Sequence, residues 1–308
     1  MKLSIVTTLY GSLPYLPEFY RRASKAARQL TDDYEIVLVN DGSVDDSLAF
    51  ALHLFETDSH VVVVDMSRNF GHHKAIMTGL NQARGDHVFL IDCDLEEPPE
   101  LLGEFWQALH DRPDHDVVYG IQRSRKGGLM ERLTGSLYYD VFNLLSNVKI
   151  QKNMSVVRLM TRRYINSLIQ YREQEPVFAG LAVLAGYRQT ALEFDKSSKG
   201  STTYTFAKKL DMVANSLASF SNRPLVYIFY LGLAVTLSSF MLVAFYIGRY
   251  FLVGASLSGW LSLIVSVWII GGLILLSLGL IGIYLAKMFS EVKNRPYSVI
   301  RAIHRREQ

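Results

Sequence analysis

A long uncharged region in the C-terminal third places the strongest constraint on how this sequence can fold. Residues 224–286 contain no Asp, Glu, Lys or His and only one Arg, Arg249. As a helix, residues 225–247 would be roughly 34 Å long, enough to cross a hydrocarbon core of about 30 Å. Residues 260–286 are long enough for a second crossing, and residues 254–259 suit a tight turn between the two. We therefore predict a hairpin of two transmembrane helices.

Basic residues flank both ends of this apolar region. Lys208, Lys209 and Arg223 precede it, and the tail 287–308 contributes six more: Lys287, Lys293, Arg295, Arg301, Arg305 and Arg306. Because cytoplasmic flanks are enriched in Lys and Arg, both ends should face the cytoplasm. Two buried helices of a soluble domain are the less favoured alternative, since apolar runs of this length are rare there. Glycines at 271, 272, 279 and 282 permit close helix contact in a homo-oligomer, or are ordinary membrane-helix glycines.

Charge and cysteine content narrow the function classes. The 308 residues include 32 Lys and Arg against 29 Asp and Glu, a net charge of +3. The chain therefore lacks the concentrated basic face that nucleic-acid binding requires, and we expect no nucleic-acid partner. Its one cysteine, Cys93, cannot form an internal disulfide, which favours a reducing compartment. Residues 1–10 lack the pattern of a signal peptide, so the N-terminal region should stay in the cytoplasm.

Strand-like and helix-like segments alternate through the N-terminal region. The predicted strands, which are short, apolar and rich in β-branched residues, are 3–9, 35–40, 60–66, 87–92 and 116–121. The predicted helices between them are 16–30, 44–55, 72–84 and 99–109. This order predicts an α/β, Rossmann-like domain with a mostly parallel sheet covered by helices on both faces.

Ligands of such sheets bind beyond the carboxyl ends of the strands, where polar clusters occur in this sequence. Neither GxGxxG after the first strand nor GxxxxGK[ST] is present, which argues against a dinucleotide dehydrogenase and a P-loop phosphotransferase. Asp92, Asp94 and Glu96 offer the hard oxygen ligands that Mg²⁺ or Mn²⁺ shares with a diphosphate. Paired acids are also common in solvated turns, and helix capping before Pro98 would explain one of them, so both interpretations stay open here.

The order of three motifs is more specific. Residues 40–43 (NDGS) end the second strand, residues 67–75 (SRNFGHHKA) follow the third, and residues 92–100 (DCDLEEPPE) follow the fourth. Together with the paired spans and residues 284–296, this pattern resembles family 2 glycosyltransferases of the polyprenyl-phosphate type, the dolichyl- and undecaprenyl-phosphate sugar transferases. The resemblance covers nearly the whole chain.

The resemblance implies a GT-A glycosyltransferase domain over residues 1–203, with site residues at the motif positions. The implied contacts to a nucleotide-sugar, with a UDP-sugar favoured, are Thr8, Tyr10, Asp41, Asn69, Lys74 and Asp92. Asp92, Asp94 and Glu96 would hold Mg²⁺ or Mn²⁺, with Asp94 as a catalytic residue. Glu96 stands where the family usually has Gln. Cys93 replaces the usual Ala, and strand alternation should point it away from the metal.

Two other family motifs differ here. Residues 154–160 (MSVVRLM) lack an acid and residues 200–204 (GSTTY) lack a lysine, which should alter sugar recognition. For four nearby residues, contact with donor or acceptor and plain surface exposure stay open: Arg158, Lys196, Lys199 and Tyr204.

The acceptor side is predicted between the sheet and the membrane. Residues 129–148 carry apolar residues at helical spacing after a basic entrance, which predicts a helix in the membrane surface or, alternatively, one packed on the sheet. Residues 204–223 form a second candidate interfacial helix. By resemblance, the acceptor-phosphate residues are Arg123, Lys126, Arg132 and Ser136, and Arg123 and Arg132 are also assigned a catalytic role.

These features lead to the hypothesis of inverting, metal-dependent sugar transfer from a nucleotide-sugar to a polyprenyl phosphate at the cytoplasmic membrane face. The phosphate nucleophile is already anionic, so the site must supply positive charge rather than a strong base. The product would serve lipopolysaccharide, O-antigen or cell-wall modification, which by family similarity suggests a bacterial inner membrane. The alternatives are a membrane polysaccharide synthase, whose QxxRW motif is absent, a non-catalytic membrane scaffold, and a lipid-sugar flippase.

Overall fold

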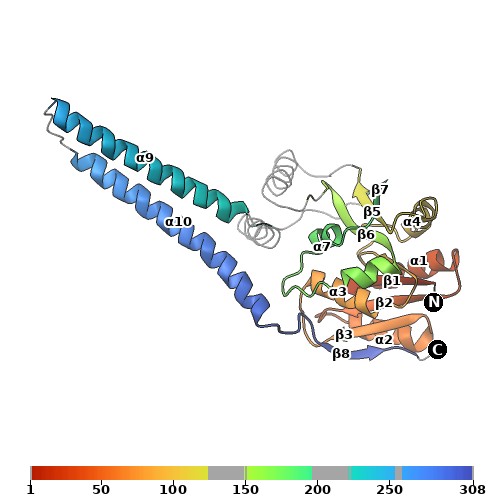
Figure 1. Cartoon of the computed structure of the whole chain (residues 1–308). Coiled ribbons are helices and arrows are strands. Elements are labelled where there is room, and N and C mark those ends of the chain that lie inside the picture. Colours follow the sequence, from red (N-terminus) through yellow and green to blue (C-terminus); the bar gives the residue numbers. More distant parts are fainter. Residues whose placement is uncertain are drawn as a thin grey trace.

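The β-branched segments of the N-terminal region pair in one sheet (Figure 1). The computed structural model describes residues 2–123, 149, 151–195, 221, 223–253 and 259–306, within which the strand order is β7-β5-β6-β4-β1-β2-β3-β8. The strands are β1 (Leu3–Leu9), β2 (Tyr34–Asn40), β3 (Val61–Met66), β4 (His87–Leu90), β5 (Val117–Gln122), β6 (Met154–Thr161), β7 (Gln189–Phe194) and β8 (Ile300–His304). Only β6 and β8 run antiparallel to their neighbours, so this described sheet is mostly parallel, as predicted.

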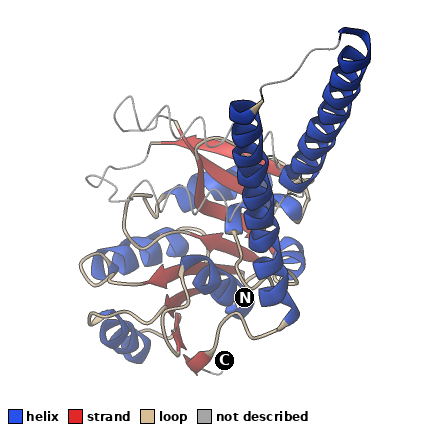
Figure 2. Cartoon of the chain, turned by 90° about the vertical axis from the view of Figure 1, so that its left-hand side faces the viewer, coloured by secondary structure: helices blue, strands red, loops and turns tan. Residues whose placement is uncertain are grey.

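Helices cover both faces of the sheet (Figure 2). They are α1 (Leu16–Arg28), α2 (Ser47–Thr57), α3 (His72–Gln82), α4 (Leu101–His110), α6 (Arg162–Leu168) and α7 (Phe178–Leu184). Side chains of α1, α2 and α4 join one apolar cluster, and those of α3, α6 and α7 join the other. Successive strand residues point to opposite faces, so Ile5 belongs to the first cluster and Val6 to the second. Burial on both faces explains why the strands are apolar throughout.

The predicted α/β order is confirmed, with two changes near the site. The fourth strand ends at Leu90 rather than at residue 92, so Asp92 lies in the loop that follows. The antiparallel strand β6 lies between β4 and β5 and was not predicted. Its pairing joins segments far apart in the sequence, which leave no local periodic signal.

The C-terminal tail returns to the sheet. Within residues 287–308, which the sequence analysis treated only as a basic tail, Ile300–His304 forms β8 and pairs with β3. The backbone N–H of Ser67 also donates to Val299 O at 2.9 Å. Beyond β8, Arg305 Nη1 donates to Glu35 Oε2 at 3.1 Å, and Glu35 is only 1% exposed. The tail is thus attached to the sheet domain by backbone pairing and by a buried ion pair.

Two long helices project away from the sheet domain (Figure 1). They are α9 (Arg223–Val253) and α10 (Trp260–Val292). Within the described residues, one segment is long and apolar enough to cross a membrane, Ser266–Val292 in α10, with a mean hydropathy of 2.4 and none of that apolar stretch buried. The apolar part described in α9, Arg223–Val235, is shorter, so the second span and the hairpin stay predictions. The candidate interfacial helix 129–148 lies wholly outside the described residues, and the candidate 204–223 lies outside them except for residues 221 and 223.

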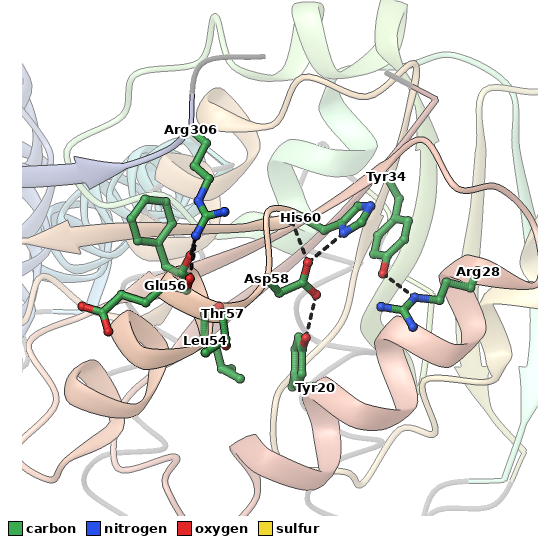
Figure 3. Close-up of polar contacts among 10 residues, drawn as sticks. Tyr20, Arg28, Tyr34, Leu54, Glu56, Thr57, Asp58, His60 and Arg306 are labelled. Carbon is green, nitrogen blue, oxygen red and sulfur yellow. Dashed lines mark hydrogen bonds and ion pairs between the residues drawn. The ribbon is translucent and has the colours of Figure 1, made fainter.

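A polar cluster stabilises the amino-end edge of the sheet (Figure 3). The Asp58 carboxylate, at the end of α2, accepts hydrogen bonds from Tyr20 Oη at 2.6 Å and from the His60 backbone N–H at 2.9 Å. The His60 ring stacks on Tyr34 with a centroid distance of 4.2 Å, and Arg28 Nε donates to Tyr34 Oη at 3.1 Å. Burial, followed by the hydrogen bond to Asp58, raises the pKa of Tyr20 to about 12, so the phenol stays a donor.

Candidate active site

The predicted donor-binding residues gather at the carboxyl edge of the sheet. β1 lies between β2 and β4, and all three strands are parallel, so their carboxyl ends meet at one edge. Thr8 and Tyr10 lie at the end of β1, Asp41 follows β2, and Asp92 follows β4. Tyr10 is 55% exposed at this edge, which leaves its ring accessible to a flat ligand.

Asp41 is buried and supports the backbone of the neighbouring loop. Its Oδ1 accepts from the Phe70 N–H at 2.7 Å and its Oδ2 from the Gly71 N–H at 3.0 Å. Burial raises the pKa of Asp41 more than these two hydrogen bonds lower it. The turn before α3 therefore depends on Asp41, and a direct contact from Asp41 to a nucleoside stays a prediction.

The next residue, Gly42, brings two loops into close contact. Gly42 has a φ of +65°, and a Cβ atom there would lie 2.4 Å from Asn69 N and 2.7 Å from the carbonyl carbon of Arg68. Glycine is therefore required at this position for two independent reasons. The contact places the predicted site residue Asn69, which is exposed, beside the loop that follows β2.

His72, the first residue of α3, connects two predicted site residues. Its Nε2 lies 3.5 Å from Asp92 Oδ1, and its Nδ1 lies 3.1 Å from Thr8 Oγ1. In the neutral ring with Nε2 protonated, Nδ1 accepts the Thr8 hydroxyl proton while Nε2–H faces Asp92. His72 belongs to the motif 67–75, but the sequence patterns predicted no role for it. Its place at the start of a helix, after the short loop 67–71 that follows the third strand, was the signal that could have identified it.

The following two residues of α3 differ in their surroundings. His73 is largely buried, its Nδ1 lies 3.0 Å from Pro176 O, and burial together with the neighbouring His72 charge lowers its pKa. Lys74, a predicted donor contact, is half-buried in the first turn of α3. Lys74 thus lies on the same helix turn as His72, near the predicted nucleotide edge.

The loop after β4 has a special backbone conformation. Asp94 Oδ1 accepts the Glu96 N–H at 3.0 Å, and Leu95 between them has a φ of +61°. Non-glycine residues rarely adopt this region, and it persists only where surrounding contacts hold it. Cys93 is 3% exposed in the apolar core, which confirms that it packs away from the acids.

The acids of this loop have the chemistry of a magnesium or manganese site. Asp92, Asp94 and Glu96 are half-buried carboxylates, and carboxylate oxygen is the ligand type these cations prefer. In the described part of the chain, no three acidic, His or Cys side chains are already gathered as a metal site. The donor set therefore fits a divalent cation by chemistry, and its assignment as a ligand set stays a prediction.

Two further acids of the same loop have structural partners. Arg22 Nε donates to Glu100 Oε1 at 2.9 Å, and this bond is the main reason that the pKa of Glu100 is lowered. Glu97 is 1% exposed and accepts a hydrogen bond from Ser155 Oγ. The structure thus gives structural partners to the two acids of this loop that were not predicted as metal ligands.

The predicted acceptor side is described in part. Arg123 follows β5 and lies near two acids, with Nη1 3.3 Å from Asp195 Oδ2 and Nε 3.6 Å from Glu193 Oε2. One strand, β6, separates β5 from β4 in the sheet, so Arg123 and the Asp92 loop follow strands that are not direct neighbours. Six other candidates lie outside the described residues: Lys126, Arg132, Ser136, Lys196, Lys199 and Tyr204.

Of the two expectations for Arg158, surface exposure is contradicted and contact with donor or acceptor stays a prediction. It is 1% exposed, so plain surface exposure is wrong. Its guanidinium lies over the Phe178 ring at 4.5 Å and donates to the backbone carbonyls of Val156 and Ser155. A buried arginine in a strand is unusual, because removing its charge from water is costly.

Comparison with known proteins identifies the chain. The sequence profile of glycosyl transferase family 2 matches residues 4–193, which include β1 to β7 almost completely. The chain belongs to glycosyl transferase family 2. One relative of this family 2 glycosyltransferase is a putative glycosyltransferase of Mycobacterium tuberculosis. The two are 46% identical over 304 residues, which cover 99% of this chain and 89% of the relative.

Two further comparisons concern function and fold. The SfII prophage-derived bactoprenol glucosyl transferase of Shigella flexneri is 31% identical to this family 2 glycosyltransferase over 311 residues, 99% of each chain. The crystal structure of a mycobacterial protein has a TM-score of 0.50 and 19% identity, covering 70% of this chain and 72% of that chain. That structural likeness concerns the fold alone and agrees with the GT-A type of sheet. The chain is therefore a glycosyltransferase by family.

Proposed function

We propose that this family 2 glycosyltransferase transfers a sugar from a nucleotide-sugar, with a UDP-sugar favoured, to a polyprenyl phosphate, with inversion at the anomeric carbon. The observation that carries the proposal is the match with bactoprenol glucosyl transferases over the whole length. The Shigella flexneri protein aligns with 99% of the chain, including the C-terminal helices, and an Escherichia coli prophage homolog of the same name is 29% identical over 98% of it. The named acceptor of these relatives is a polyprenol.

The donor would bind at the carboxyl edge of β1, β2 and β4. We assign the nucleotide to the surface of Thr8, Tyr10, Asn69 and Lys74, with Asp41 holding the loop beneath it. Asp92, held by His72, would lie beside the ribose and the diphosphate. The exposure of Tyr10 and the convergence of three parallel strand ends support this placement.

Asp92, Asp94 and Glu96 would hold Mg²⁺ or Mn²⁺. When bound, such a cation neutralises the charge that develops on a leaving diphosphate. The side chains of the protein would orient the acceptor phosphate, and we assign this role to Arg123, Arg132, Lys126 and Ser136. A phosphate monoester carries about −1.5 to −2 charges near neutral pH, so it attacks without a strong general base. When Arg123 is released from Glu193 and Asp195, its guanidinium would be available to bind the acceptor phosphate.

The exposed apolar surface of α10 supports a location in a membrane. Trp268 is 78% exposed and Leu275 is 71% exposed, and contiguous apolar surface of this kind is rare on a soluble monomer. Tyr284 Oη donates to Ser221 O at 2.5 Å, so the end of α10 lies beside the start of α9. β8 then pairs with β3, which attaches the end of α10 to the sheet domain. These contacts support two spans with both polar ends on the cytoplasmic side of a bacterial inner membrane.

One reconstitution tests the proposal. The purified chain is incubated with undecaprenyl phosphate, Mg²⁺ or Mn²⁺, and a panel of UDP-, GDP- and dTDP-sugars, and the lipid is analysed by mass spectrometry. We expect one polyprenyl-phosphate-sugar, which would then supply glycan modification. A polymer would identify a polysaccharide synthase, transport of preformed glycolipid without any donor would identify a flippase, and no product with any donor would favour a scaffold.

A further inference from the structure

A hydrogen-bonded chain of a buried acid, a half-buried serine and a buried arginine connects the loop after β4 with the start of β6. Glu97 and Arg158 are each 1% exposed. Ser155 Oγ donates to Glu97 Oε1, and Arg158 Nη2 donates to Ser155 O at 3.1 Å. The Arg158 charge also interacts favourably with the Glu97 carboxylate. The first residues of β6 are thereby connected to the end of the loop that carries Asp92, Asp94 and Glu96.

The strand register places Arg158 close to this loop. In the antiparallel pair of β4 and β6, Arg158 lies opposite Leu90, the last residue of β4. Directly opposite residues share one face of a sheet. Asp92 follows Leu90 by two residues, so Arg158 lies next to the base of the loop.

The buried Arg158 does not stabilise the fold efficiently. Burial lowers the pKa of Arg158, which means that its charged form is disfavoured there despite the nearby Tyr164 and Glu97. Its Nη1 group has no hydrogen-bond partner among the residues that the structure describes. A buried charge with an unmade hydrogen bond is destabilising, and apolar residues of similar size often stabilise such sites equally well or better.

The loop itself needs external support. Leu95 has a φ of +61°, which a leucine adopts only when surrounding contacts enforce it. Glu97 lies two residues further along, and its side chain is fixed by Ser155. The hydrogen-bonded residues Glu97, Ser155 and Arg158 are therefore placed to hold this strained turn.

We infer that Arg158 is a positioning residue which, through Ser155 and Glu97, holds the 92–97 loop in the conformation that presents its acids to a divalent cation. The inference rests on the proposed function for the role of that cation. It concerns the loop conformation and requires no contact between Arg158 and the donor.

The same loop offers a matched control pair. Arg22 and Glu100 form an ion pair three residues beyond Glu97, directly before α4, but their side chains are 26% and 54% exposed and lie outside the Glu97–Ser155–Arg158 chain. The double variants R158M/E97Q and R22M/E100Q each replace one acid–arginine pair by uncharged residues of similar size. The single variant E97Q retains the carbonyl oxygen that accepts the Ser155 hydrogen bond, so it should fold even if the double variant does not.

The experiment uses the full chain in detergent and two readouts. Hydrogen exchange of the amides of residues 93–97, without metal, reports the loop conformation directly. We expect exchange at least tenfold faster in R158M/E97Q, an intermediate increase in E97Q, and parental exchange in R22M/E100Q. Mn²⁺ affinity, measured by electron paramagnetic resonance on the metal alone, should fall about tenfold in R158M/E97Q and stay parental in the control. Melting temperatures of all variants identify any general loss of stability.

The outcomes separate this inference from the proposed function. Parental exchange over residues 93–97 in both E97Q and R158M/E97Q overturns the positioning role. An equal increase in R22M/E100Q also overturns it, since any charge removal would then have the same effect. A parent protein that binds no Mn²⁺ contradicts the metal part of the proposed function, while the exchange data still decide whether Arg158 holds the loop.

Discussion

His72 Nε2 lies 3.5 Å from Asp92 Oδ1, while Nδ1 of the same ring lies 3.1 Å from Thr8 Oγ1. One imidazole at the start of α3 thus connects the loops at the ends of β1 and β4. Asp92 lies beyond the last residue of its strand, so strand pairing does not fix its side chain. Its orientation depends in part on this histidine.

Replacing His72 should weaken the reaction more than the fold. We expect H72A to lower kcat/KM for the nucleotide-sugar about tenfold, equivalent to about 1.4 kcal/mol of transition-state stabilisation, because Asp92 loses an orienting partner. Since His72 is exposed, the melting temperature should change little. H53A, at an exposed position of α2, is the control. Parental kcat/KM in H72A would show that Asp92 is oriented without it.

Removing the Asp94 carboxylate should nearly abolish transfer. We expect D94A to lose at least about 100-fold in kcat with an unchanged circular dichroism spectrum, because charge stabilisation at the diphosphate is lost. The exposed E104A on α4 should transfer at the parental rate. Normal turnover by D94A, in a titration with Mg²⁺ or Mn²⁺, would contradict the assignment of Asp94 to the metal.

Gly42 should tolerate no side chain. We expect G42A to lower the free energy of unfolding by about 2–4 kcal/mol, because the new Cβ meets the backbone at Asn69 and the φ of +65° is strained. Gly11 is a matched control, with a φ of +64° and no atom within 4 Å of the added Cβ. G11A should cost only about 1 kcal/mol. The free energy of unfolding of both variants is measured by thermal or urea unfolding. If G42A and G11A lower it equally, backbone strain alone, and not the close approach of the loops, explains the effect of G42A.

The Asp58 cluster should make stability sensitive to acid. Burial acts to raise the pKa of Asp58, but hydrogen bonds from Tyr20 and His60 outweigh it and hold the pKa below its ordinary 3.8. A carboxyl group of this kind stabilises the fold above its unfolded-state pKa, and the contribution is lost as the pH falls through the folded-state value. We expect D58N to be less stable by about 1–2 kcal/mol at pH 7.

The pH dependence provides the check. Between about pH 4 and pH 2, the difference in melting temperature between the parent and D58N should shrink, because the parent loses its charge there. D32N, at an exposed position outside the cluster, is the control variant. If the difference in melting temperature between the parent and D58N stays constant down to pH 2, the lowered pKa of Asp58 is contradicted.

Breaking the ion pair of the tail should destabilise the sheet domain. Arg305 is 12% exposed and Glu35 is 1% exposed, so R305A leaves a carboxylate buried with one partner fewer. We expect a loss of about 3 kcal/mol in the free energy of unfolding. R305M/E35Q, which removes both charges, should regain part of it. If the double variant is no more stable than R305A, the loss comes from β8 packing rather than from the uncompensated charge.

Much of the fold was accessible from local sequence patterns. The strand β1 was predicted at its observed bounds, and the next two strands to within one residue at each end, because β-branched runs between helical segments are a local signal. The apolar content of residues 224–286 indicated long helices for the same reason. The predicted interfacial helix 129–148 and the partner residues Lys126 and Arg132 lie outside the described residues and stay predictions.

The sequence by itself determined the family, the layered sheet domain and the edge where the donor motifs meet, because parallel strands bring their carboxyl ends together wherever the intervening helices run. Only the tertiary structure decided that β6 lies beside β4, that β8 forms the other edge, and that Arg158 is buried together with Glu97 of the loop. It also brought His72 to Asp92. These relationships join residues far apart in the chain, and contacts of that range are fixed by packing and by satisfying buried polar groups, which leave no periodic pattern in the sequence.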